Sequence, residues 1–137
     1  MPRIASPTLS NLSTGTPYEI LLTIYGSFQN GFGFEYSKNR ITCKDKSDSL
    51  SIALYNGTSD GSAVEIHNFA STAIGVLKPN PPTPLPFPDN TQSVNFGLTN
   101  LQDNQLVDFA MFVVVTSKDA TKTHTLLCDP QIGNDPD

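Results

Sequence analysis

The chain is poor in several residue types on which common protein activities depend. Its 137 residues include no tryptophan, two cysteines, two histidines and eight lysines and arginines together. A catalytic zinc ion takes three protein ligands and a structural one takes four, so His67 and His124, with no further ligand at suitable spacing, argue against a zinc site. The net charge of −5 provides no dense positive surface for phosphates, which argues against nucleic acid as a partner.

Long apolar segments are also missing. The longest uninterrupted apolar run, residues 109–115, has seven residues, whereas a membrane-spanning helix needs about 20. The N-terminal sequence MPRIASPTLSNLS has no apolar core of the kind found in signal peptides. Three explanations fit this N-terminus: a cytoplasmic protein, release by a route that needs no such peptide, or a leader that has already been removed.

The chain instead has many uncharged polar residues. Hydrophobic residues make up 37% of the sequence and charged residues only 15%, with serine, threonine and asparagine abundant. This composition is more typical of an extracellular or carbohydrate-facing β protein than of a cytosolic enzyme. The length predicts one domain, residues 1–137, that can bury a core without a metal or a disulfide.

Alternation of apolar and polar residues predicts β-strands throughout this domain. In residues 106–117 the odd positions from 107 to 115 hold only apolar side chains, which indicates a strand with one fully buried face. Similar segments, separated by turn signals such as Asn30-Gly31 and Asn56-Gly57, are residues 18–25, 32–36, 40–44, 49–55, 63–69, 91–98 and 122–128. We therefore predict an all-β fold, a two-sheet antiparallel sandwich of seven to eight strands, either immunoglobulin-like or jelly-roll.

Two segments do not fit the strand pattern. Residues 1–17 contain three prolines and predict an irregular N-terminal arm or an edge segment. Residues 79–88 contain six prolines, which remove amide donors and keep the segment out of a sheet interior. We expect this proline-rich segment to cross from one sheet to the other or to cover a sheet edge.

The two cysteines, Cys43 and Cys128, leave two alternatives open. They can be small buried apolar residues, or they can form a disulfide that ties an early strand to the last one. The chain-entropy model assigns such a bridge roughly 4 kcal/mol, because the loop that it closes is long. No neighbouring residue pattern activates either thiol as a nucleophile.

One short motif resembles a hydrolase signature. Residues 57–61 have the form G-x-S-x-G, which in a hydrolase places the serine on a turn between a strand and a helix. Here the residues that follow predict a strand, and two turn dipeptides flank the serine. The motif is therefore typical of a hairpin loop, and a small serine hydrolase that uses Ser59 is a distant alternative.

Oxygen-rich turns and clustered aromatic residues are the candidate ligand sites. Calcium takes six to eight oxygen ligands from loops of this kind, although solvated turns favour the same residues. Aromatic residues between positions 25 and 36 can provide a sugar-binding face or fill the core. The candidate ligand-binding residues are Asn30, Tyr36, Asp103, Asn104, Asp129, Asn134 and Asp135. The candidate calcium ligands are Asp129, Asp135 and Asp137.

The second half of the chain resembles bacterial inclusion-body proteins of the AidA/PixA type. The resemblance rests on short features: Leu54-Tyr55 at a strand end, residues 91–94 after the proline-rich segment, the apolar strand 109–115, and Asp129-Pro130 before Ile132. The family tends to place a tryptophan before this Asp-Pro pair, whereas Cys128 stands there in this chain. The resemblance implies a non-enzymatic β-sandwich, cytoplasmic or stored, for which sugar binding is suspected in some relatives.

These observations favour a protein that binds rather than catalyses, and they indicate no catalytic residue. The first hypothesis is a lectin-like module that binds a glycan, with calcium as a candidate cofactor. The second is a structural or self-assembling protein, in which sheet edges or the N-terminal arm pair between subunits of a homo-oligomer.

Overall fold

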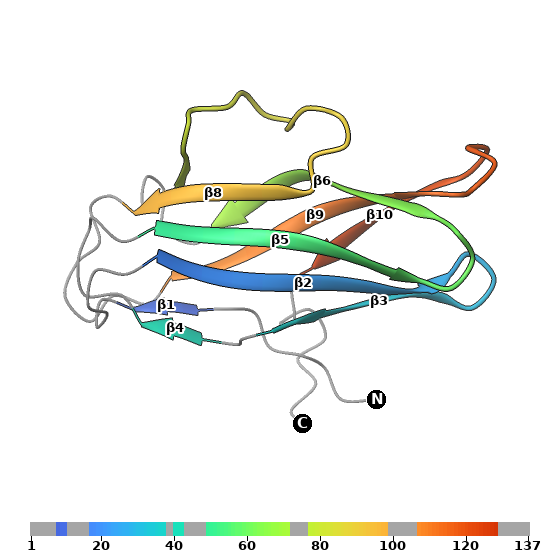
Figure 1. Cartoon of the computed structure of the whole chain (residues 1–137), viewed down its shortest axis with the longest axis horizontal. Coiled ribbons are helices and arrows are strands. Elements are labelled where there is room, and N and C mark those ends of the chain that lie inside the picture. The colour runs from blue at the N-terminus through green and yellow to red at the C-terminus, as the bar shows by residue number, and fades with distance from the viewer. Residues whose placement is uncertain are drawn as a thin grey trace.

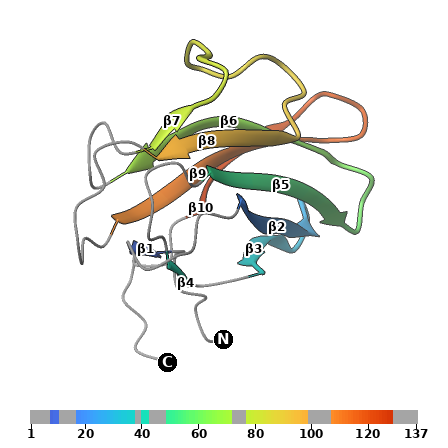
Figure 2. The ribbon, with the colours of Figure 1, turned by 60° about the vertical axis from the view of Figure 1, so that its left-hand side comes forward.

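Ten β-strands form two sheets in the computed structural model of the protein, which describes residues 8–10, 17–37, 40–42, 49–71, 77–98 and 107–128. The first sheet has the order β3 (Gly31–Tyr36), β2 (Pro17–Ser27), β5 (Ser49–Thr58), β8 (Ser93–Leu98) and β7 (Leu77–Pro79). The second has the order β10 (Thr123–Cys128), β9 (Val107–Thr116), β1 (Thr8–Ser10) and β4 (Arg40–Thr42), and β6 (Ala63–Ser71) also pairs with β9. Figures 1 and 2 show the sheets as two layers.

The predicted all-β, two-sheet class is confirmed. Within the described ranges, seven strands have six or more residues, and β1, β4 and β7 have three each. Most neighbouring strands are antiparallel, but β2 pairs with β5 and β1 pairs with β4 in parallel. The described segments contain no helix of the length and hydropathy needed to cross a bilayer.

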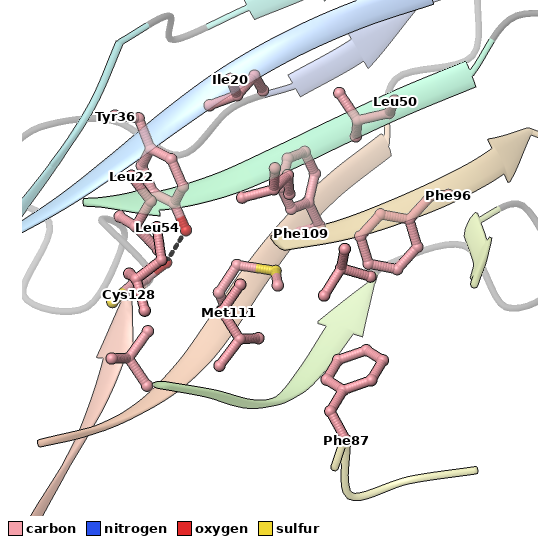
Figure 3. Close-up of a cluster of buried hydrophobic side chains, with 14 of the residues drawn as sticks. Ile20, Leu22, Tyr36, Leu50, Leu54, Phe87, Phe96, Phe109, Met111 and Cys128 are labelled. Atoms are coloured by element: carbon pink, nitrogen blue, oxygen red, sulfur yellow. Dashed lines mark hydrogen bonds between the residues drawn. The ribbon is translucent and has the colours of Figure 1, made fainter. Parts of the chain in front are cut away.

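The core lies between the sheets and follows the predicted alternation. Inward side chains on β5 and β8 are buried at every second position, as period-two geometry requires. Burial of each large apolar side chain contributes about 1.5–3 kcal/mol relative to exposure. The core residues labelled in Figure 3 are Ile20, Leu22, Tyr36, Leu50, Leu54, Phe87, Phe96, Phe109, Met111 and Cys128.

Strand β6 contains a bulge that changes which face its side chains occupy. Ile66 pairs with Val113 and Asn68 with Phe112, so His67 has no partner in the register. Val64 and Ile66 point into the core before the bulge, and Phe69 packs against the core after it. Because of the extra residue, even-numbered side chains of β6 face the core before the bulge, and an odd-numbered side chain packs against the same core after it.

The proline-rich segment covers an edge of the second sheet. It begins with Pro79, the last residue of β7, and ends before β8, and both strands lie in the first sheet (Figure 2). The Phe87 amide donates to the His67 carbonyl at 2.8 Å, and the Ile66 amide donates to the Thr91 carbonyl at 2.8 Å. The Phe87 side chain is buried and stacks on Phe69, with ring centroids 6.1 Å apart. The segment thus holds β6 by backbone hydrogen bonds and by an aromatic side chain.

Candidate functional site

Three turns meet at one end of the sandwich, which is the right-hand end in Figure 1. They are residues 28–30 between β2 and β3, residues 59–62 between β5 and β6, and residues 117–122 between β9 and β10. The Ser59 amide donates to the Gly26 carbonyl at 2.9 Å, and the Phe28 amide donates to Asp60 Oδ2 at 3.0 Å. These bonds fix the first two turns to each other.

A hollow of about 480 Å³ lies among these turns. We call it the loop-end hollow. Each of the three turns contributes to its lining, and the lining combines one aromatic ring, one hydroxyl, two carboxylates and two ammonium groups. The lining residues are Phe28, Asp60, Ser117, Lys118, Asp119 and Lys122.

Aromatic packing holds Phe28 in place. Its ring meets the Phe32 ring edge to face, with centroids 5.0 Å apart. Phe32 in turn stacks on His124 of β10, at 5.9 Å between centroids. Lys122 Nζ lies 5.9 Å from the centroid of the Phe28 ring, within the range of a cation–π contact. One edge of the hollow is therefore built from both sheets.

Asp60 shapes the turn between β5 and β6. Its Oδ1 accepts hydrogen bonds from the Ser62 hydroxyl at 2.6 Å and from the Ser62 amide at 3.1 Å. The Ser62 hydroxyl and the Phe28 amide stabilise the charged carboxylate, so they lower the pKa of Asp60 below its ordinary value.

Asp119 has the same role in the turn between β9 and β10. Its Oδ1 accepts hydrogen bonds from the Thr121 hydroxyl, the Ser117 hydroxyl and the Thr121 amide, at 2.7, 2.7 and 3.1 Å. These donors, the Thr121 hydroxyl first, lower the pKa of Asp119 to about 2. Both carboxylates are therefore ionised at neutral pH and held in place.

Lys118 is supported by the neighbouring turn. A Cβ on Gly61 would lie 3.0 Å from Lys118 Cδ, which shows that the aliphatic part of this lysine packs directly over the glycine. Gly61 has a φ of 78°, a conformation that favours glycine. The glycine thus permits both the turn and the close approach of Lys118.

The structure places two of the predicted ligand-binding residues, and neither lines the hollow. Asn30 is exposed in the same turn as Phe28, where its amide donates to Ser27 Oγ at 3.0 Å. Tyr36 is 3% exposed, and its hydroxyl donates to the Cys128 carbonyl oxygen at 2.7 Å (Figure 3). Tyr36 is thus a core residue here and does not face a ligand.

The other predicted ligand residues lie outside the described residues. They are Asp103, Asn104, Asp129, Asn134, Asp135 and Asp137. Cys43 is outside them as well. Cys128 is a free, buried cysteine, which supports the alternative of a small buried apolar residue over the disulfide. Within the described ranges, no group of three or more His, Cys, Asp or Glu side chains could hold a metal ion.

Sequence reasoning identified only Phe28 among the lining residues, as a member of the aromatic cluster. The remaining five residues lie in turns whose composition is ordinary for solvated loops. No signal in the sequence indicates that these turns meet. They do so because β2, β5 and β9 all run toward the same end of the sandwich, which is known from the structure.

Ser59 and Cys128 are not arranged as catalytic nucleophiles. The Ser59 hydroxyl bonds to the Gly26 carbonyl at 3.2 Å, and the residues after this turn form strand β6 in place of the helix that a hydrolase motif needs. Cys128 is fully buried, and desolvation raises the pKa of its thiol to about 12.

Comparison of the sequence with protein-family models and with curated proteins gives no match. The similarity to AidA/PixA-type proteins accordingly stays a prediction from the sequence, and the loop-end hollow is assessed from its own chemistry.

Proposed function

We propose that the protein is a non-enzymatic binding module that takes a carbohydrate in the loop-end hollow. The observation that carries this proposal is the convergence of three turns around Phe28. A sugar ring has an apolar C–H face, which packs on an aromatic ring, and a rim of hydroxyls, which need both donors and acceptors. The hollow provides the ring, two ammonium donors and two carboxylates, part of whose hydrogen-bonding capacity is used within their own turns.

The fixed geometry of the turns supports binding. Asp60 and Asp119 are each held by several hydrogen bonds from their own turns, and Phe28 is held by Phe32. A site whose side chains are already ordered loses less conformational entropy when a ligand binds. This smaller entropy loss matters most for a ligand that interacts weakly, such as a saccharide.

A glycan array, probed with and without calcium, tests the proposal. We expect binding to at least one class of glycan, and we expect Phe28→Ala to reduce it by about tenfold or more. Tyr55→Ala is the matched control, because Tyr55 is an aromatic residue 57% exposed on the first sheet and away from the hollow. An array without hits, or equal losses in both variants, would contradict the proposal.

Self-assembly is the second candidate, and the edge strand β10 favours it. None of its residues, THTLLC, carries a formal charge, and Leu127 is 38% exposed. An uncharged edge strand can pair with a strand from another chain, which natural proteins commonly prevent with lysine or proline. We expect Thr125→Lys to reduce any assembly, measured by light scattering over a range of concentrations. A wild-type protein that stays monomeric at high concentration would exclude this candidate.

A further inference from the structure

Two of the three lysines that the structure describes lie at the loop-end hollow, in a chain that is acidic as a whole. The structure describes three lysine side chains, those of Lys78, Lys118 and Lys122. Two of them, Lys118 and Lys122, line the hollow, in a chain with a net charge of −5. The hollow thus brings two ammonium groups together with the carboxylates of Asp60 and Asp119.

The aspartates in the hollow are already used within the protein. Asp60 accepts hydrogen bonds on both carboxylate oxygens, and Asp119 Oδ1 accepts three. Much of their hydrogen-bonding capacity is therefore used by the amides and hydroxyls of their own turns. Each ammonium group, in contrast, has three donors. Lys118 is held through its methylene groups over Gly61, and Lys122 lies beside the Phe28 ring and interacts with the charge of Asp119. The ammonium groups are thus the strongest donors that remain for a ligand.

Lys122 places a positive charge beside the aromatic ring of Phe28. Because Lys122 Nζ lies 5.9 Å from the Phe28 centroid, an anion bound to Lys122 also lies beside this ring. Lys118 crosses from the turn of residues 117–122 to Gly61, so it supplies charge from another side of the hollow. A ligand that joins an anionic group directly to a sugar ring satisfies Phe28 and both lysines together.

We infer that the ligand is an acidic saccharide, a sugar whose ring carries a carboxylate, as in a uronic or sialic acid. The inference rests on the proposed function and specifies its ligand class. The carboxylate binds Lys118 and Lys122, and the apolar face of the same sugar packs on Phe28. A charge-assisted hydrogen bond is stronger than a neutral one, so the carboxylate provides the main anchor.

Matched ligands test this inference by calorimetry or by NMR titration. The pairs are methyl galacturonoside with its methyl ester, and sialyllactose with its methyl ester, because the members of each pair differ only in whether one carboxylate is charged. We expect the acidic member of at least one pair to bind about tenfold or more tightly than its neutral partner. We also expect its affinity to fall as salt rises, since the site is open to solvent.

Variants identify the residues responsible. Lys118→Met and Lys122→Met keep an unbranched apolar side chain, which preserves the packing over Gly61 and beside Phe28. Their combination is expected to remove the preference for the acidic ligand, whereas Lys78→Met, a lysine on β7, is expected to leave it unchanged. Circular dichroism and thermal unfolding confirm that each variant folds.

The outcomes separate the inference from the proposed function. Binding of neutral and acidic members with equal affinity overturns the inference and leaves carbohydrate binding intact. No binding of any saccharide overturns both. Inorganic phosphate that binds as tightly as the acidic sugar overturns the inference too, because the site would then recognise an anion without the sugar. A preference that survives the double lysine variant has the same consequence.

Discussion

The Tyr36 hydroxyl donates a 2.7 Å hydrogen bond to the backbone carbonyl of Cys128, and this bond joins an edge strand of one sheet to an edge strand of the other (Figure 3). Because both groups are buried, Tyr36→Phe removes the donor and leaves the carbonyl short of a partner. We expect a loss of about 1–3 kcal/mol in the free energy of unfolding, measured with denaturant. Tyr55→Phe, at an exposed site, is the control and should change stability by less than about 0.5 kcal/mol.

Gly26 is required at the end of β2. It has a φ of 107°, and a Cβ there would collide with the carbonyl oxygen of Gly31. Gly26→Ala is therefore expected to cost more than about 2 kcal/mol, because backbone must move and the conformation is strained.

Gly31 provides the matched control for this substitution. Its φ is 90°, but no heavy atom lies within 4 Å of the position that an added Cβ would take, so Gly31→Ala meets strain without collision. We expect a cost of about 1 kcal/mol. Equal costs at the two positions in a denaturant series would contradict the importance of the collision.

Acid should weaken the turn between β9 and β10. The folded pKa of Asp119 is about 2, below the ordinary value of 3.8, so its contribution to stability is present above pH 3.8 and is lost as pH falls toward 2. Asp119→Asn should make the stability less dependent on pH within that window. An NMR titration of the Asp119 carboxyl carbon checks the cause directly, and a midpoint near 3.8 would contradict it.

The Cys128 thiol should be inert in the folded protein. Burial keeps it protonated, with a pKa of about 12, so thiol reagents at a pH of about 8 are expected to leave it unmodified until the protein unfolds. A titration of free thiols in denaturant without reductant tests the alternative of a disulfide between Cys128 and Cys43. Two reactive thiols exclude the disulfide, and none supports it.

Calcium binding at Asp129, Asp135 and Asp137 stays a prediction from the sequence. Binding to the folded state alone would stabilise it by about 2.7 kcal/mol when calcium is present at about 100 times its Kd. We expect calcium to raise the melting temperature and a chelator to reverse the change. An unchanged melting temperature, or the same increase in a variant with all three aspartates replaced by asparagine, would remove this prediction.

The sequence predicted the buried positions well wherever one rule governed a whole strand. Leu50, Ile52 and Leu54 on β5 are buried as expected, and so are Val94, Phe96 and Leu98 on β8. Strand β6 was the weaker prediction because the bulge at His67 shifts the parity, which moves Phe69 to the core side. An alternating pattern cannot show such a shift unless the partner strand is known.

The pairing of the strands and the geometry of the loop-end hollow could not be predicted from a single sequence, for a different reason. The parallel pairing of β2 with β5 depends on where residues 28–48 pass, and local patterns do not encode this path. The loop-end hollow likewise combines Phe28, Asp60 and the turn of residues 117–122, which are separated by long stretches of chain. Each turn alone has an ordinary composition, and the chemistry of the hollow arises only where the three turns meet.

The proline-rich segment also limits how copies of the chain can associate. Phe87 and Thr91 occupy backbone groups of β6 at His67 and Ile66, on the side that does not face β9. An incoming strand would have to displace them and withdraw Phe87 from the interior. Proteolytic cleavage or shortening of residues 80–86 would therefore expose the edge of β6 to a strand from another chain. A chain cut there should polymerise or aggregate more readily than the intact one.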